Sequence, residues 1–169
     1  MDIKELISNS STHLDRVLAF FPRVETKATA LFAVNIAMLG VVAVNIKFVD
    51  LFIIPIIALA VVTAILLCVS TWFVYLAFFP DFDGDESTSV LYFRAVKKMS
   101  KENFFRHMKA MSPEQYVDDF LDQIWRNSAI LTRKFSYIKK AFIFTALSLP
   151  FWFVFLLFAT VFHSQVVLK

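Results

Sequence analysis

The sequence predicts an all-α integral membrane protein with three transmembrane helices and a helical cytoplasmic insert between the second and the third. Hydrophobic residues make up 59% of the chain, well above the roughly 45–50% that is usual in soluble domains. Three apolar runs, at residues 28–46, 51–79 and 141–162, are each long enough to cross a bilayer as a helix. The chain has 2 glycines and no long linker, so we expect a single domain over residues 1–169.

The segment 1–27 is expected to form a cytoplasmic helix that leads into the first span. Thr12 to Asp15 fits a helix-capping pattern, and Pro22 is expected to kink the chain before the membrane. No apolar stretch followed by a cleavage site occurs here, so we expect no signal peptide to be removed. Only residues 47–50 link the first two spans, which favours a tight hairpin in which Asp50 caps the second helix.

The second apolar run, residues 51–79, would measure about 43 Å as a helix, which exceeds the thickness of a bilayer core. We therefore expect it to tilt strongly or to project beyond the cytoplasmic face. The acidic stretch "DFDGDE" follows it. This stretch resembles the opening of a calcium loop, but its glycine falls fourth instead of sixth, so we interpret it as a solvated turn.

Residues 80–140 show three helix starts. Ser87 or Ser89 can cap a first short helix, and Ser100 can cap a second. The stretch "SPEQ" from Ser112 to Gln115 combines a cap, a proline at the first helical position and a glutamine that can bond back to the cap. No glycine or proline follows until Pro150, so the third helix is predicted to continue as a stalk into the span at 141–162.

The distribution of lysine and arginine predicts the orientation. Four of these residues precede the first span and eleven lie in residues 80–140, whereas only Lys47 and Lys169 lie on the other side. Cytoplasmic flanks of membrane proteins carry such an excess of positive charge. We therefore expect a cytoplasmic N-terminus and an external tail at residues 163–169.

The sequence contains no pattern typical of an enzyme or a metal site. Cys68 is the only cysteine, and none of the three histidines has a second histidine, cysteine or glutamate one helical turn away. No glycine-rich phosphate loop is present. The pI near 9.0 is explained by the basic flanks of the spans, so we expect no DNA or RNA partner.

Polar residues nevertheless recur on one face of the long helix and at the entry to the first span. Those on the long helix are Asp119, Gln123, Asn127 and Lys134, with Ile130 among them. Those at the entry are Glu25, Thr26 and Lys27, with Asn35 inside the span. Buried polar groups in a membrane are paired or functional, so charges from the two helices are expected to meet at the cytoplasmic edge. The alternative is that Lys27 extends to the interface and Asn35 bonds a backbone carbonyl.

These residues carry a family resemblance. The segment "DRVLAFFPRVETKATALFAVNIAMLG" and the insert from "VLYFRAVKKM" to "FSYIKKAF" resemble the transmembrane effector of bacterial Pycsar antiphage systems, the PycTM domain. The most specific pieces are the entry Glu25-Thr26-Lys27-Ala28 with Asn35 behind it, and the stalk pattern of Asp119, Gln123, Ile130 and Lys134. Two positions depart from the family pattern: Glu25 replaces an aspartate, and Arg94 stands where an acidic residue is expected.

The resemblance implies a bacterial inner-membrane effector of abortive infection. A pyrimidine cyclase makes cyclic CMP or cyclic UMP during phage infection, and the effector senses this ligand and impairs the membrane. Such a ligand has one negative charge and an aromatic base, so it requires a cation, a stacking surface and amide groups. The candidates for ligand binding are Arg94 or Lys134 for the phosphate, Gln123 or Asn127 for the base, and Tyr92 for stacking. The candidates for gating and helix packing are Glu25, Thr26, Lys27, Asn35 and Asp119.

Two other classes of function stay open at this point. A constitutive membrane scaffold or accessory subunit would need no ligand. A small channel or transporter gated by another ligand would line a midplane cavity with polar groups, and the first two spans offer few apart from Asn35, Thr63 and Ser70. Three helices cannot enclose a conducting path, so we expect a homo-oligomer, with membrane lipid as its surroundings.

Overall fold

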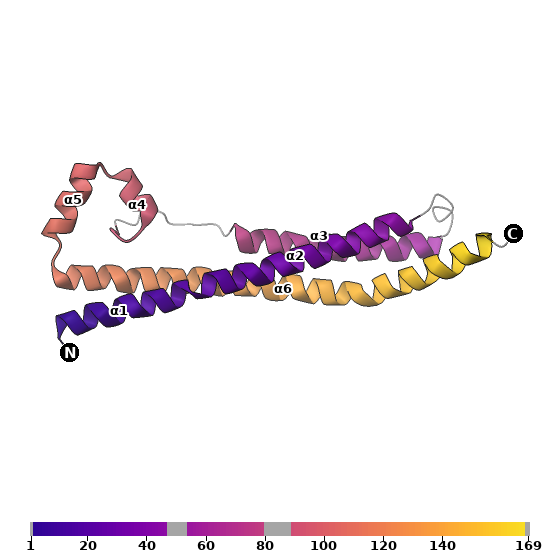
Figure 1. Ribbon diagram of the computed structural model, residues 1–169, viewed down its shortest axis with the longest axis horizontal. Helices are drawn as coiled ribbons and strands as arrows, with labels where there is room; N and C mark the ends of the chain where they lie inside the picture. Colours follow the sequence, from indigo (N-terminus) through magenta and orange to yellow (C-terminus); the bar gives the residue numbers. More distant parts are fainter. Residues whose placement is uncertain (1, 47–53, 80–88, 168–169) are drawn as a thin grey trace. The chain divides into compact units, whose positions relative to one another are not determined.

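The computed structural model describes residues 2–46, 54–79 and 89–167, and the side chains of Arg94 and of residues 162–167 lie outside the description. Every regular element in these ranges is a helix, so the predicted fold class is confirmed (Figure 1). The helices are α1 (Ile3–Leu18), α2 (Phe20–Asn45), α3 (Ile54–Phe78), α4 (Phe93–Lys98), α5 (Lys101–Ala110) and α6 (Pro113–Val167).

The chain divides into two compact units, which we describe separately. The polar unit comprises Met1–Arg23 and Pro80–Arg133, and the apolar unit comprises Val24–Phe79 and Lys134–Lys169. Helix α6 contributes to both, which confirms that the stalk and the third apolar run form one helix. The predicted cap at Asp50, the acidic stretch 81–86 and Ser87 lie outside the described residues.

The first helix begins earlier than the sequence predicted. Helix α1 starts at Ile3, and Thr12 lies inside it, where its hydroxyl donates to the carbonyl of Ser8 at 2.8 Å. The predicted cap at Thr12 to Asp15 is therefore wrong, because a threonine inside a helix can bond the carbonyl four residues back. The helix is interrupted at Ala19. Pro22 explains this, since its ring would clash with the carbonyl of Leu18 if the helix continued unbroken.

Local capping signals fix the starts of α5 and α6. The Ser100 hydroxyl oxygen accepts from the Asn103 amide at 3.2 Å, as predicted. At the start of α6 the Ser112 and Gln115 side chains exchange bonds with each other's backbone amides, at 2.9 and 3.2 Å, which confirms the capping box. Ser89 does not cap α4. The N-cap of α4 is Tyr92, without a side-chain cap, and the Ser89 hydroxyl oxygen instead accepts from the Leu91 amide in the preceding turn.

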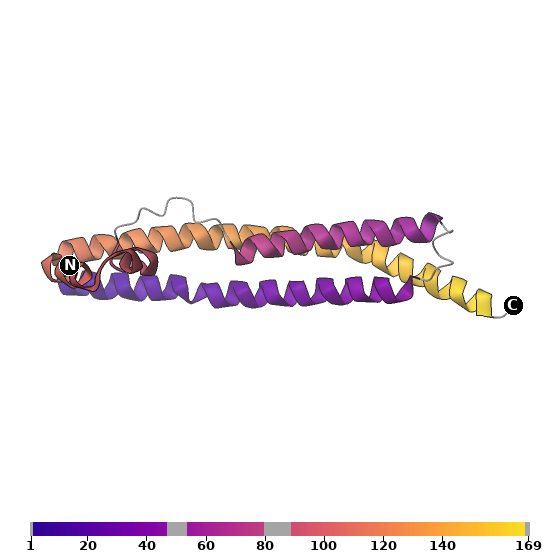
Figure 2. The same cartoon turned by 90° about the horizontal axis from the view of Figure 1, so that it is seen from above.

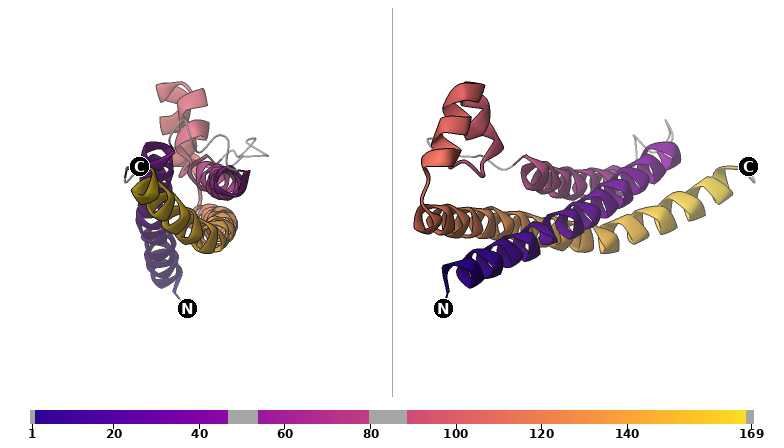
Figure 3. Two further views of the ribbon diagram at one scale, coloured as in Figure 1. Left: turned by 90° about the vertical axis from the view of Figure 1, so that its right-hand side faces the viewer. Right: turned by 60° about the vertical axis from the view of Figure 1, so that its left-hand side comes forward.

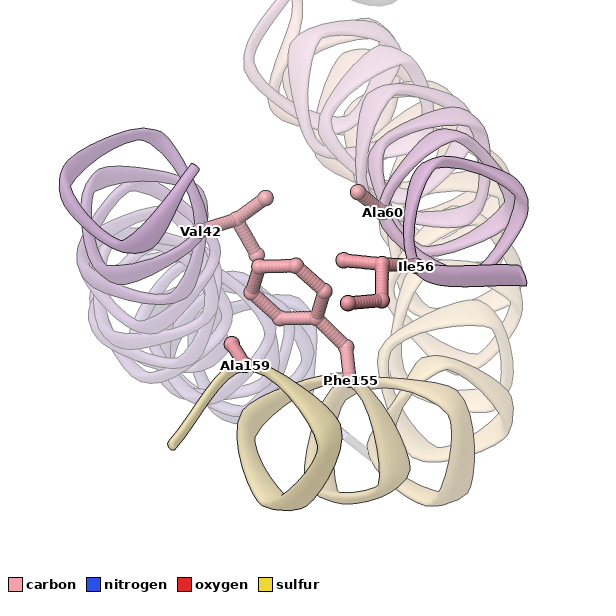
Figure 4. Close-up of a cluster of buried hydrophobic side chains, with 5 residues drawn as sticks. All are labelled: Val42, Ile56, Ala60, Phe155 and Ala159. Carbon is pink, nitrogen blue, oxygen red and sulfur yellow. The ribbon is translucent and has the colours of Figure 1, made fainter. Parts of the chain in front are cut away.

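The apolar unit packs α2, α3 and the second part of α6 side by side (Figures 2 and 3). Its core cluster consists of Val42, Ile56, Ala60, Phe155 and Ala159. The Phe155 ring points between α2 and α3 and is fully buried (Figure 4). The last part of α6 curves (Figures 1 and 2), and Pro150 provides a local cause because it removes one helical hydrogen bond.

Within the described ranges, three helical stretches are long and apolar enough to cross a membrane. In the most apolar stretch of each, only 22–28% of the residues are buried within the protein. Many of the remaining side chains of these helices face outward, among them Val44, Ile54 and Leu157, which are 82%, 81% and 66% exposed. Large apolar surface of this kind is stable in lipid and unstable in water. The arrangement is that of a multi-pass membrane protein.

Candidate functional site

In the polar unit, Asp119 of α6 holds the turn that precedes α4. Its carboxylate oxygen Oδ2 accepts from the backbone amides of Val90 and Leu91, at 3.0 and 3.3 Å. Asp119 is 8% exposed, so these bonds are largely shielded from water. Hydrogen bonds to a charged acceptor are stronger than neutral ones. This Asp119 clamp, made of Asp119, Val90 and Leu91, therefore fixes the turn against α6.

An aromatic stack lies beside the clamp. The guanidinium carbon of Arg126 lies 4.2 Å from the centroid of the Tyr92 ring, a close cation–π contact. Phe93 meets the same ring edge-on, with centroids 5.2 Å apart. Asp119 and Arg126 are seven residues apart, so they occupy the same face of α6. The clamp and the stack thus hold consecutive parts of one turn, at residues 90–92.

Gln123 lies on α6 between Asp119 and Arg126. It is 5% exposed, and its side-chain amide makes no hydrogen bond within the part of the chain that the structure describes. No fully enclosed side-chain nitrogen or oxygen among these residues lacks a partner, so the amide keeps a small solvent-accessible area. Asn127 differs, because its amide nitrogen donates to the Gln123 carbonyl at 2.8 Å. Gln123 is therefore the more buried of these two amides, and neither its side-chain oxygen nor its side-chain nitrogen bonds another described residue.

The other two predicted ligand residues, Arg94 and Lys134, differ in what the structure describes of them. Arg94 lies in α4, two residues after Tyr92, and its side chain is outside the description. Lys134 belongs to the apolar unit, where its Nζ donates to Glu25 Oε1 at 3.1 Å. The structure thus brings together Tyr92, Asp119 and Gln123, whereas Lys134 pairs with the entry residue Glu25.

The entry to the apolar unit carries this ion pair. The Lys134 side chain is 7% exposed and the Glu25 side chain 49% exposed, so the pair is buried on one side only. Lys27 does not join it. Its Nζ lies 5.8 Å from the centroid of the Phe135 ring. Thr26 lies between the two on α2 and is exposed.

Because burial is unequal, the two halves of the ion pair should respond differently to mutation. Glu25→Gln leaves a buried ammonium without its carboxylate, and we expect it to destabilise the protein by about 1–2 kcal/mol. Lys134→Met keeps the apolar stem and leaves a carboxylate that water can reach, so its cost should be below about 1 kcal/mol. Denaturation of the purified variants in detergent measures both. The double variant should lose less than the sum, and strict additivity would contradict a direct pair.

Deeper in the apolar unit, one side chain from each helix closes a hydrogen-bonded ring. The Asn35 amide nitrogen of α2 donates to the Ser70 hydroxyl of α3 at 2.8 Å. The Ser70 and Thr145 hydroxyls lie 2.8 Å apart, and the Thr145 hydroxyl donates to Asn35 Oδ1 at 2.8 Å. When Ser70 donates to Thr145, the three bonds run in one direction around the ring. Such cycles strengthen each member by polarisation.

The ring, defined as Asn35, Ser70 and Thr145, has further acceptors around it. The second amide proton of Asn35 points to the Thr71 hydroxyl at 3.3 Å, and the Ala141 carbonyl lies 2.9 Å from the Ser70 hydroxyl. Asn35 and Ser70 are fully buried. The alternative in which Asn35 bonds only a backbone carbonyl is not what the contacts show, since its partners are side chains of the two other helices.

Sequence reasoning missed an apolar cleft of about 280 Å³ in the polar unit. It lies where α1, α5 and the start of α6 meet, and it is lined by Ile7, Met108, Met111, Ser112, Pro113 and Tyr116. None of these residues is charged, so the cleft provides no side chain to neutralise a phosphate. The described residues also contain no group of histidine, cysteine and acidic side chains that could hold a metal ion.

The fold and these polar sites define an all-helical membrane protein in which a compact polar unit accompanies three membrane-length helices. The sequence matches the family described as Pycsar effector protein domain, PycTM, over residues 9–161. The chain therefore belongs to this family of membrane effectors, as its resemblance indicated. Comparisons with curated proteins and with solved structures gave no significant match.

Proposed function

We propose that this protein senses a cyclic pyrimidine nucleotide, cyclic CMP or cyclic UMP, and then impairs the bacterial inner membrane. The proposal rests on membership of the Pycsar effector family, which implies a cyclic nucleotide signal and a partner cyclase. In this view the polar unit receives the ligand and the apolar unit responds. Helix α6 belongs to both units and is the element that would carry the response.

The observation that best supports a ligand site in the polar unit is Gln123. Its nearly buried amide has no hydrogen-bond partner among the described residues, and a nucleobase edge would supply both a donor and an acceptor in place of water. Tyr92 is the proposed stacking residue; it is buried and Arg126 lies over its ring, so a stacking base would take the place of that guanidinium. Arg94, two residues later in α4, is the proposed phosphate ligand. Asp119 acts in this arrangement as a positioning residue, because it holds the turn that carries Tyr92.

The proposed orientation, with the polar unit in the cytoplasm, is supported by the charge distribution and by the chemistry of the proposed ligand. A cyclic nucleotide is made in the cytoplasm and its charge keeps it out of hydrocarbon, so the polar unit should face the cytoplasm. The excess of lysine and arginine in residues 80–140 supports the same orientation. A reporter fused after Lys169 should then be active only outside the cytoplasm. Cytoplasmic activity of that reporter would contradict the orientation.

The responding form is proposed to be a homo-oligomer. The apolar unit has three helices, whose centre is filled by the Phe155 cluster and the Asn35 ring, so one copy has no space for a conducting path. Mass photometry of the detergent-solubilised protein, with and without nucleotide, measures the assembly. A monomer under both conditions would count against this part of the proposal.

Nucleotide titration tests the function directly. The purified protein in detergent should bind cyclic CMP or cyclic UMP more tightly than cyclic AMP or cyclic GMP, as measured by calorimetry. A charge-assisted contact contributes roughly 1.5–3 kcal/mol, so loss of the phosphate ligand in Arg94→Ala or Lys134→Ala should weaken binding about ten- to hundredfold. Gln123→Leu removes the amide at nearly constant size and should also weaken binding.

Lys97→Ala provides the matched control, since Lys97 is an exposed cation of the same short helix as Arg94. It should bind like the parent. If Arg94→Ala, Lys134→Ala and Gln123→Leu all bind as tightly as the parent while remaining folded, the site lies elsewhere. If no cyclic nucleotide binds or shifts the melting temperature, a constitutive scaffold becomes the better interpretation.

A further inference from the structure

In the apolar unit, aromatic rings of α3 and α6 interleave around a lysine. The Phe73 ring of α3 stacks on Tyr137 and on Phe144 of α6, with centroids 6.5 and 5.7 Å apart. Lys140 lies on the same face of α6, and its Nζ is 5.4 Å from the Phe73 centroid and 5.9 Å from the Tyr137 centroid. We call these four residues the aromatic–lysine cluster. It joins two helices through side chains that span about two turns of α6.

Within this cluster, Lys140 lies where the sequence pattern of α6 predicts a membrane boundary. Lys140 is the last charged residue before the uncharged stretch 141–161 of α6, which measures about 30 Å as a helix and so equals the thickness of a bilayer core. Residues 54–73 of α3 are likewise uncharged and of similar length. Trp72 and Tyr75, beside Phe73, are 58% and 50% exposed, as aromatic residues at the lipid–water interface usually are.

The positive charge of the cluster has no protein counterion among the described residues of this unit. Glu25 is the one carboxylate among the residues of the apolar unit that the structure describes, and it pairs with Lys134. Lys139 and Lys140 are both exposed, and within the described chain neither forms an ion pair. Two ammonium groups at a lipid boundary without a carboxylate form a site that is complementary to an anion.

We propose that the aromatic–lysine cluster binds the phosphate of an anionic phospholipid, phosphatidylglycerol being the probe for this class. The Lys140 ammonium faces the phosphate, and the Phe73 and Tyr137 rings hold the lysine at the interface and contact the lipid below it. Because the cluster combines residues of α3 and α6, lipid binding stabilises the arrangement in which Phe73 lies between the two α6 rings. This site is independent of the proposed nucleotide site.

The test is thermal unfolding of the full-length protein in neutral detergent micelles, titrated with phosphatidylglycerol or phosphatidylcholine. Phosphatidylglycerol should raise the melting temperature at lower concentration than phosphatidylcholine does. One lysine near an anionic surface contributes about a fivefold factor in affinity, so Lys140→Gln should need about fivefold more phosphatidylglycerol for the same shift. Lys140→Arg retains the charge and should respond like the parent.

Lys101→Gln is the matched control, because Lys101 also lies over a ring, 5.7 Å from the Phe105 centroid, but in α5 of the polar unit. It should leave the lipid response unchanged. An equal response of the parent to both lipids, or to inorganic phosphate alone, overturns the proposal. So does a Lys140→Gln variant that responds like the parent. If Lys140→Gln does not fold, the proposal is tested by comparing the responses of the parent and of Lys140→Arg to the two lipids.

Discussion

Asn35→Ala is expected to lower the free energy of unfolding by about 2–4 kcal/mol, since it removes the residue that joins all three helices of the apolar unit. Asn35 bonds Ser70 and Thr71 of α3 and Thr145 of α6, and it is fully buried. Its loss leaves a small cavity, and it leaves the Ser70 oxygen without the amide donor. Denaturant or thermal unfolding in detergent measures the change.

Asn45→Ala is the control for this prediction, because Asn45 is in the same helix but its amide donates to the Val41 carbonyl of its own turn, at 2.8 Å. Its effect should stay within about 0.5 kcal/mol. If the ring holds the resting state, Asn35→Ala should also impair membrane integrity in cells without nucleotide. Equal stability losses for the two variants would show that the ring contributes nothing particular.

Asp119→Ala is expected to release the turn before α4, because the backbone amides of Val90 and Leu91 lose a charged acceptor. A bond to a charged group is worth roughly 1.5–3 kcal/mol, so the Val90 amide should exchange hydrogen about ten- to hundredfold faster. The Leu91 amide keeps its bond to the Ser89 hydroxyl oxygen, at 3.1 Å, and should change less. Hydrogen exchange read by NMR or by overlapping peptides detects this. The Asn103 and Gln115 amides, which bond serine caps, should be unaffected.

Asp118→Ala is the matched control, since Asp118 is the neighbouring residue of the same helix and is exposed. It should change neither exchange nor nucleotide affinity. Asp119→Ala should weaken nucleotide binding through Tyr92, whose position depends on the turn. Unchanged exchange at Val90 and Leu91 in Asp119→Ala would contradict the clamp. Faster exchange with unchanged nucleotide affinity would support the clamp but show that it does not contribute to ligand binding.

The sequence predicted best where the cause is local. The Ser112–Gln115 capping box and the Ser100 cap depend on residues three positions apart, so the pattern alone specifies them. The prediction of a cap at Thr12 was wrong because a threonine can either cap a helix or bond the carbonyl four residues back. Which of the two occurs depends on whether the residues before it are already helical. The three apolar runs predicted membrane-length helices because length and hydropathy require no knowledge of packing.

Contacts between different helices were harder to predict from the sequence. Asn35 was conspicuous because an amide in an apolar run needs a partner, but single hydroxyls such as Ser70 and Thr145 usually bond their own helix and do not indicate which helix they face. Glu25 and Lys134 were expected to meet because both lie close to the cytoplasmic edge of the membrane in the sequence, and the structure pairs them. The insert contains several cations, and the sequence does not indicate that Arg126 is the one that contacts Tyr92. That contact depends on how the turn at residues 90–92 folds.

The two layers of the apolar unit differ in how they tolerate movement. The contacts of Phe155 with Val42 and Ile56 have no preferred direction, so a small tilt of α6 preserves most of them. The bonds of the Asn35 ring, all 2.8 Å long, depend on both distance and angle, and a shift of about 1 Å breaks them. If α6 tilts, the apolar contacts of Phe155 are therefore kept while the hydrogen bonds of the Asn35 ring break together. The apolar unit would then change conformation in one step, above a threshold of tilt, instead of gradually.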